Sequence, residues 1–201
     1  RTLLAPARMG RPRPDENIPM NAIDRPAPPW QVDRWFNTSR PLSLEALRGK
    51  VIVLEAFQML CPGCVSHGLP QASRVHATFS AHQVAVIGLH AVFEHHAAMT
   101  PVALEAFLHE YRIAFPVGVD RPGTRGPIPQ TMEAYAMRGT PTLVLIDAHG
   151  RIRHQHFGQV SDLVLGAQIA SLVHEAQLAT QEQDGASIAP GCGPEGCALT
   201  A

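Results

Sequence analysis

Residues 51–64 have the sequence VIVLEAFQMLCPGC. The first seven of them, Val51–Phe57, are mostly apolar and rich in β-branched side chains, as in a buried strand, and a helix-like segment follows Cys64. Two residues separate Cys61 from Cys64, so both sulfur atoms can meet across a first helical turn, where the helix N-terminus stabilises a thiolate. This stretch therefore predicts a dithiol redox centre between a strand and a helix.

A C-x-x-C string also occurs in metal sites. Zinc held by Cys61 and Cys64 would need two more ligands, and the pair near the C-terminus, Cys192 and Cys197, could supply them. Among the histidines, no spacing matches a ligand pair on one helix. The strand and helix around the motif favour redox chemistry, so we expect no metal and no cofactor.

Composition narrows the class of protein. The chain has 201 residues, 45% hydrophobic and 16% charged, with a formal net charge of -1, which is typical of one globular domain. It has no basic run that would bind nucleic acid and no apolar stretch long enough to span a bilayer. Four cysteines are too few to stabilise a chain of this length by disulfides alone, so its stability must come from a packed hydrophobic core. No segment of signal-peptide type follows Arg1; the compartment stays open, with the cytoplasm favoured for the chain as given and an exported location if a signal segment has been removed.

The two ends differ in composition from the middle. Residues 1–29 contain seven prolines and predict an extended arm. Residues 180–201 are rich in small and polar residues and predict a flexible tail that carries the second cysteine pair. The folded domain is expected over residues 30–179.

Strand-like and helix-like patterns alternate within this domain. The predicted strands are 30–36, 51–57, 84–90, 115–119, 142–146 and 151–157, and the predicted helices are 42–48, 100–111, 130–137 and one that begins at 161–162. In the last helix, Leu163 and Leu165 are among the residues expected to face the core. The order predicts an α/β fold, a three-layer sandwich with a central mixed sheet and an N-terminal β extension.

Three segments in a fixed order resemble the thioredoxin-like superfamily, specifically its TlpA and ResA-like redoxin branch, related to AhpC/TSA proteins. They are residues 42–54, the CPGC motif and residues 139–147, GTPTLVLID. The resemblance covers about residues 30–179. It implies a thioredoxin-like sandwich with the dithiol at a helix start, facing a loop with a cis peptide bond between Thr140 and Pro141. This loop would bind the substrate backbone, together with Pro62 and Gly63 between the cysteines.

Chemistry assigns a role to each reactive group. Cys61 is expected to be the exposed attacking thiolate, with a pKa below the free value of about 8.5, and Cys64 to resolve the mixed disulfide. Glu55 interrupts the apolar strand six positions before Cys61, where thioredoxins carry a buried acid. Desolvation would raise the pKa of its carboxyl group, which could then accept the proton of Cys64. The alternative is that Glu55 lies on an edge strand, where its side chain reaches solvent or pairs with an arginine.

Some residues depart from the family pattern. Leu60 precedes the first cysteine where the family has tryptophan, and Pro70 follows Cys64 by six positions rather than five. His67 stands near the place of a glutamate in ResA-like proteins, so it either modulates the thiols or is a plain surface histidine.

Three functions remain open at this stage. The leading one is a thiol:disulfide oxidoreductase that acts on protein disulfides or dithiols, as a reductant supplied by an upstream electron donor. The second is a thiol peroxidase, although Leu54 and Gln58 stand where peroxiredoxins carry proline and threonine. The third is a copper or zinc carrier. Cys192 and Cys197 would either relay electrons to the first pair or belong to a passive tail.

Overall fold

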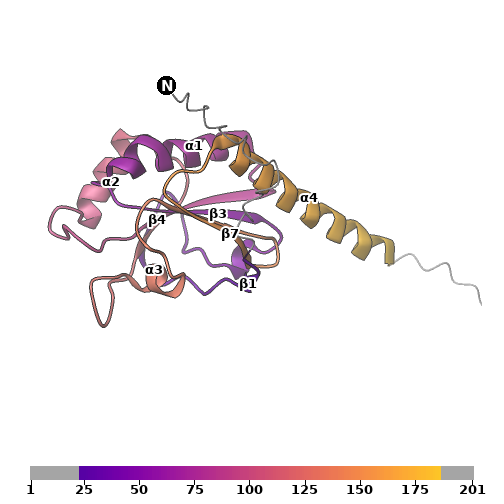
Figure 1. The fold of residues 1–201 in the computed structure, drawn as a ribbon, viewed down its shortest axis with the longest axis horizontal. Coiled ribbons are helices and arrows are strands. Elements are labelled where there is room, and N and C mark those ends of the chain that lie inside the picture. Colours follow the sequence, from indigo (N-terminus) through magenta and orange to yellow (C-terminus); the bar gives the residue numbers. More distant parts are fainter. Residues whose placement is uncertain (1–22, 187–201) are drawn as a thin grey trace, which may run out of the picture.

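A mixed seven-stranded sheet forms the centre of the computed structural model, which describes residues 23–186 and their side chains as far as residue 181 (Figure 1). The strand order is β1-β7-β6-β3-β4-β5-β2. The strands are β1 (Arg25–Pro26), β2 (Val32–Phe36), β3 (Val51–Phe57), β4 (Val84–His90), β5 (Val117–Asp120), β6 (Thr142–Ile146) and β7 (Arg151–Phe157). Strands β3, β4 and β5 are parallel to one another, and all other pairings are antiparallel.

Helices cover both faces of this sheet. On one face lie α1 (Leu69–Thr78), α2 (Pro101–Glu110) and α4 (Asp162–Ala186), and the short α3 (Gln130–Ala134) lies on the other (Figure 1). A 3-10 turn, η1 (Glu45–Leu47), adds to the second face, and a π-helical turn, η2 (Cys64–Gly68), runs into α1. The predicted three-layer α/β sandwich is confirmed.

Strand β3 divides two hydrophobic cores. All seven of its residues are buried, since it lies between β6 and β4 with helices above and below. Val51, Val53 and Phe57 face the core under α1, α2 and α4, whereas Ile52 and Leu54 face the core next to α3. Because successive side chains of a strand alternate between faces, Glu55 belongs to the first of these cores.

The N-terminal residues complete both edges of the sheet. Strand β1 pairs with β7 through Arg25 and Ile152, and β2 pairs with β5. Ile23 and Trp30 pack against the core next to α3. The last residues of the stretch expected to be an extended arm are therefore part of the sheet.

Most predicted elements lie where the pattern placed them, but Leu163 does not face the core. Its exposed fraction is 86%, whereas Leu165, Ile169 and Leu172 are buried. Two residues along an α-helix correspond to a rotation of about 200°, so Leu163 and Leu165 point in opposite directions. The prediction for Leu163 was wrong because it followed apolarity rather than the helical period.

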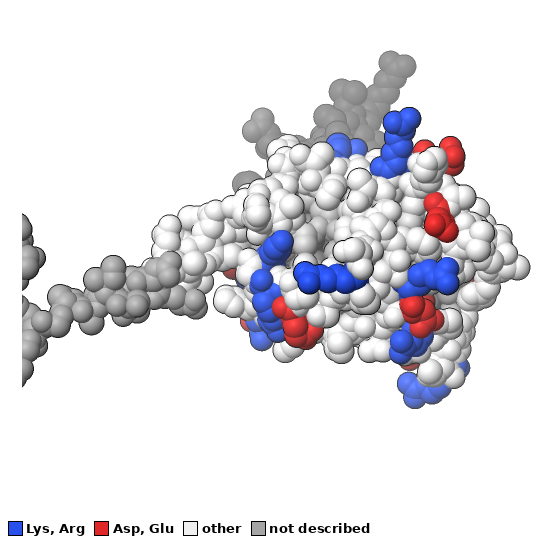
Figure 2. All heavy atoms as spheres, turned by 180° about the vertical axis from the view of Figure 1, so that it is seen from behind, with Lys and Arg blue, Asp and Glu red and all other residues white. Residues whose placement is uncertain are grey.

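Two surface properties bear on partners. Within residues 23–186, α4 is the longest helix, and neither it nor any other helix combines the length and apolar character needed to cross a bilayer. On the face opposite to that of Figure 1, basic and acidic side chains are interspersed (Figure 2).

Candidate active site

The two cysteines of the CPGC motif lie where β3 gives way to a helix. A short loop follows Phe57, and the helical backbone begins at Pro62. Cys61 and Cys64 form a disulfide with their Cα atoms 5.2 Å apart. Cys61 is partly exposed and Cys64 is completely buried. The site thus has one outer and one inner sulfur, as the assigned roles require.

Backbone groups surround the outer sulfur. The N–H of Cys64 donates to Cys61 Sγ at 3.2 Å, and the carbonyl oxygen of Thr140 lies 3.5 Å from the same atom. A donor at this position, together with the helix N-terminus, favours the thiolate form of Cys61 once the disulfide opens.

The loop opposite the dithiol contains the expected cis peptide bond between Thr140 and Pro141. Pro141 is buried against the helix start: a Cβ atom on Gly63 would lie 3.3 Å from Pro141 Cδ. The structure therefore brings together Gly63, Thr140 and Pro141 beside Cys61, while Pro62 is exposed at the helix start.

A π-helical turn explains the unusual position of Pro70. Residues Cys64–Gly68 form this turn, in which the N–H of Leu69 donates to the carbonyl of Cys64. A π turn closes after five residues rather than four, so it takes up one additional residue. Pro70 consequently follows Cys64 by six positions and still stands in the first turn of α1. The late position of Pro70 was visible in the sequence, but only the backbone shows that a π turn causes it.

Glu55 is buried in the middle of the sheet. Its exposed fraction is 1%, and Oε1 has no hydrogen-bond partner among the described residues. Burial raises the pKa of this carboxyl group to about 8. The alternative of an edge-strand residue reaching solvent or an arginine is wrong, because β3 lies between β6 and β4.

The carboxylate lies against the helix that carries the dithiol. A Cβ atom on Gly68 would collide with Glu55 Oε1 and approach Pro141 Cβ at 3.1 Å. Gly68 is four residues after Cys64, at the end of the π turn. The sequence therefore needs glycine here, since any side chain would displace the acid.

A cavity of about 100 Å³ connects Glu55 to polar groups near the surface. It is lined by Glu55, His67, Gly68, Gln71, Arg74, Leu143, Gly158, Gln159, Val160 and Asp162. Gln71 donates to Asp162 at 2.7 Å, and Arg74 forms an ion pair with the same carboxylate at 3.1 Å. A space of this size holds several water molecules, at about 30 Å³ each. Water that enters this cavity would contact both Glu55 and His67.

Sequence reasoning missed the buried histidine at the end of β4. His90 has an exposed fraction of 0%, and neither ring nitrogen has a hydrogen-bond partner among the described residues. Burial lowers the pKa of its imidazole to about 4, so the ring is neutral at neutral pH. Its ring packs 5.3 Å from that of Phe57. Its place as the last residue of a predicted buried strand was the available signal.

The second cysteine pair, Cys192 and Cys197, lies outside the described residues. Among residues 23–186, no group of three histidine, cysteine, aspartate or glutamate side chains is arranged to hold a metal ion.

Comparisons with known proteins agree with this geometry. The model of the AhpC/TSA family matches residues 23–155. This chain is 63% identical in sequence to a thioredoxin-like superfamily protein of known crystal structure. The two structures align with a TM-score of 0.73, and the alignment covers 74% of this chain and 96% of the other. A thiol-disulfide isomerase from Corynebacterium glutamicum is 54% identical, with a TM-score of 0.70 and coverages of 73% and 96%.

Among curated proteins, Protein DipZ of Mycobacterium bovis is 27% identical over 148 residues, which are 73% of this chain. The chain spans only 20% of the length of that relative. The dithiol at a helix start, the cis-proline loop and the sandwich around them agree with the resemblance noted in the sequence. The chain belongs to the AhpC/TSA family and has the fold of the thioredoxin-like superfamily.

Proposed function

We propose that the protein is a thiol:disulfide oxidoreductase that exchanges disulfides with protein substrates. The observation that carries the proposal is the disulfide between Cys61, which is partly exposed, and Cys64, which is buried. An outer sulfur can reach a second molecule, whereas the inner sulfur reaches only its neighbour. The name of the similar Corynebacterium glutamicum protein, a thiol-disulfide isomerase, supports the same chemistry.

The exchange runs in two steps when the protein starts in its reduced form. The thiolate of Cys61 attacks a substrate disulfide, forming a mixed disulfide and releasing one substrate thiolate. Cys64 then loses its proton and attacks the sulfur of Cys61, which releases the second substrate thiolate. The substrate gains two electrons, and the protein is left with the Cys61–Cys64 disulfide. An upstream dithiol must reduce this disulfide before the next turnover.

Glu55 supplies or removes the proton of the inner sulfur. With a pKa of about 8, it is mostly protonated at neutral pH while the disulfide is closed. It can then give its proton to the Cys64 thiolate when an incoming reductant opens the disulfide. In the opposite direction, the ionised carboxylate takes the proton of Cys64 during resolution. Water in the cavity beside Gly68 carries the proton to and from solvent.

The loop at Thr140 and Pro141 holds the substrate beside the outer sulfur. Its backbone lies next to Cys61, so an extended substrate segment can run along it, as strands pair at an exposed backbone edge. Pro62 and Gly63, at the helix start next to this loop, can contact the same segment. Gly63 leaves Pro141 room to pack against the helix start.

The test compares two oxidants of the reduced protein. Reduced protein, freed of excess dithiothreitol, is mixed with insulin or with hydrogen peroxide, and loss of its two active-site thiols is followed. We expect rapid oxidation by the protein disulfide and slow oxidation by peroxide. Faster oxidation by peroxide would favour the thiol peroxidase alternative and overturn the proposal. Equilibration with glutathione buffers then gives the reduction potential, which assigns the direction of electron flow.

A further inference from the structure

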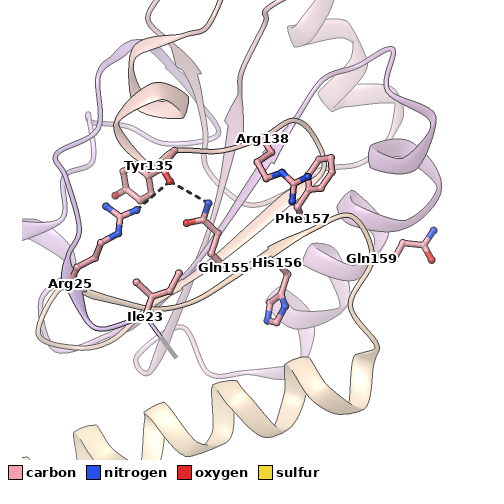
Figure 3. Close-up of a pocket in the computed structure, with 9 residues that line it drawn as sticks. Ile23, Arg25, Tyr135, Arg138, Gln155, His156, Phe157 and Gln159 are labelled. Carbon is pink, nitrogen blue, oxygen red and sulfur yellow. Dashed lines mark hydrogen bonds between the residues drawn. The ribbon is translucent and has the colours of Figure 1, made fainter. Parts of the chain in front are cut away.

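A hollow of about 500 Å³ lies beside the cis-proline loop, between β1, the end of α3 and β7 (Figure 3). Its lining residues are Ile23, Arg25, Tyr135, Ala136, Arg138, Gln155, His156, Phe157 and Gln159. Figure 3 shows the side chains of Arg25 and Gln155 directed at the carbonyl of Tyr135. Each donates to that oxygen at 3.2 Å. These hydrogen bonds hold the side chains of Arg25 and Gln155 in place at the wall of the hollow.

One wall of the hollow leads directly to the dithiol. Arg138 stands two residues before Thr140, whose carbonyl oxygen lies 3.5 Å from Cys61 Sγ. Phe157 packs against Gly139 so closely that a Cβ there would lie 2.9 Å from its ring. The N–H of Gly158 donates to the carbonyl of Pro141 at 2.9 Å. A chain that is bound at the loop and leaves it on this side therefore passes Arg138 and Phe157.

The lining of the hollow carries positive charge without a counter-charge. The guanidinium of Arg138 lies 5.5 Å from the centroid of the Phe157 ring, and the Phe157 side chain is 54% exposed. Neither Arg25 nor Arg138 has a carboxylate within 4.0 Å among the described residues, and no acidic residue lines the hollow. The ring restrains the guanidinium of Arg138, so less entropy is lost when it binds a carboxylate.

Strand β7 also offers a backbone edge here. Strand β1 pairs with Arg151 and Ile152, and the N–H of Ile23 donates to the carbonyl of Arg153. Residues 154–157 lie beyond this pairing in the described part of the chain. An extended segment can lie along this edge while its side chains enter the hollow.

We propose that this hollow binds the acidic flank of the polypeptide whose disulfide Cys61 attacks, with Arg138 as the residue that selects it. The inference rests on the proposed function and names its substrate class. An extended chain rises about 3.3 Å per residue, so an Asp or Glu about two to four residues from the attacked cysteine falls near Arg138. The ion pair raises the rate of productive encounter more than the rate of the chemical step.

The test uses three peptides with an intramolecular disulfide that differ only in Glu, Gln or Lys three residues from the cysteine. The reduced full-length protein should reduce the Glu peptide with a kcat/KM about threefold to tenfold above that of the Lys peptide. The Arg138→Gln protein should lose this preference, so that its kcat/KM values for the Glu and Lys peptides lie within about twofold of each other. Arg138→Lys keeps the positive charge but lacks the planar guanidinium group, so it should retain part of the preference.

A matched control is Arg34→Gln, which removes an exposed arginine from β2 at the opposite edge of the sheet. It should leave the preference unchanged, and added salt should weaken the preference in both this variant and the wild type. Equal rates for the three peptides would overturn the inference and leave the proposed function standing. No reduction of any peptide would instead contradict the proposed function. A preference for the Glu peptide that is absent from the wild type and present in the Asp15→Asn, Glu16→Gln protein would mean that this chain's own N-terminal segment fills the hollow, which also overturns the inference.

Discussion

The carboxylate of Glu55 and the backbone of Gly68 lie so close together that no Cβ atom fits between them. The buried acid of the central strand is thereby fixed against the helix that begins with the dithiol. Any change in the packing of this helix start is transmitted to the acid, and any movement of the acid is opposed by the helix. Stability and proton transfer should therefore depend on the same contact.

Replacing Gly68 by alanine should lower the free energy of unfolding by about 1–3 kcal/mol, because the new methyl group overpacks the contact with Glu55 and Pro141. Chemical denaturation measures this change. Gly166→Ala is the control, since a Cβ at this position in α4 meets nothing within 4 Å. That variant should be more stable than the wild type by about 0.5–1 kcal/mol. Equal effects of the two substitutions would contradict the contact.

The contribution of Glu55 to the stability of the protein should decline as pH rises from about 5 to 8, whereas His90, with its lowered pKa, has the opposite effect below about pH 6.5. The pKa of Glu55 is about 8 in the folded protein and about 4.3 when unfolded, so between these values the folded state holds a proton that the unfolded state lacks. The ionisation of Glu55 therefore favours unfolding increasingly as pH rises. Glu55→Gln removes this component, so its advantage over the wild type should grow from pH 5 to pH 9, reaching about 2 kcal/mol or more.

Urea denaturation at several pH values tests this prediction. Glu105→Gln serves as the control, because it removes an exposed carboxylate from α2 and is expected to change stability by less than about 0.5 kcal/mol. A stability difference between Glu55→Gln and the wild type that does not vary with pH would show that Glu55 ionises normally.

The same substitution should separate the two half-reactions. Glu55→Gln should slow resolution by Cys64 by about 100-fold or more, and should affect the attack by Cys61 much less, because an amide cannot take up the proton of the inner thiol. In the wild type, resolution should become faster as pH rises to about 8, since the ionised fraction of the Glu55 carboxyl group then increases to about one half. Rapid-quench analysis of the mixed disulfide measures both steps. Unchanged rates between pH 6 and 9 would reduce Glu55 to a structural role.

The two cysteine variants should differ in kind. Cys61→Ser should abolish reduction of protein disulfides, whereas Cys64→Ser should accumulate mixed disulfides through Cys61, because the partly exposed cysteine attacks and the buried one resolves. Mass spectrometry of non-reduced samples identifies the trapped species. Iodoacetamide should label Cys61 before Cys64 in the reduced protein, and the reverse order would contradict the assignment.

The second cysteine pair makes a prediction of its own. If Cys192 and Cys197 relay electrons, the Cys64→Ser protein should form a disulfide between Cys61 and one of the tail cysteines, which peptide mapping detects. A protein in which both tail cysteines are serine should then turn over more slowly on a protein disulfide. No crosslink and equal turnover would leave the tail pair without a redox role.

Local sequence patterns predicted the strands and helices well but predicted the long-range contacts poorly. The bounds of β3 and β4 match the prediction because their apolar runs are short and rich in β-branched residues. The buried state of Glu55 followed from its place in such a run. The π turn at Cys64 was foreshadowed only by the late position of Pro70. The hollow at Arg138 joins residues 23–25 to residues 135–159, and no local pattern brings such distant segments together.

The pairing of β1 with β7 also sets an order of events during synthesis. The partners Arg25 and Ile152 are among the first and the last residues of the sheet. β1 consequently leaves the ribosome long before the strand it needs, and it stays unpaired until β7 has emerged. Contacts between such distant residues slow folding, because the whole intervening chain must be ordered before they form. The N-terminal β segment is therefore exposed to chaperones and proteases for longer than any other strand of this domain.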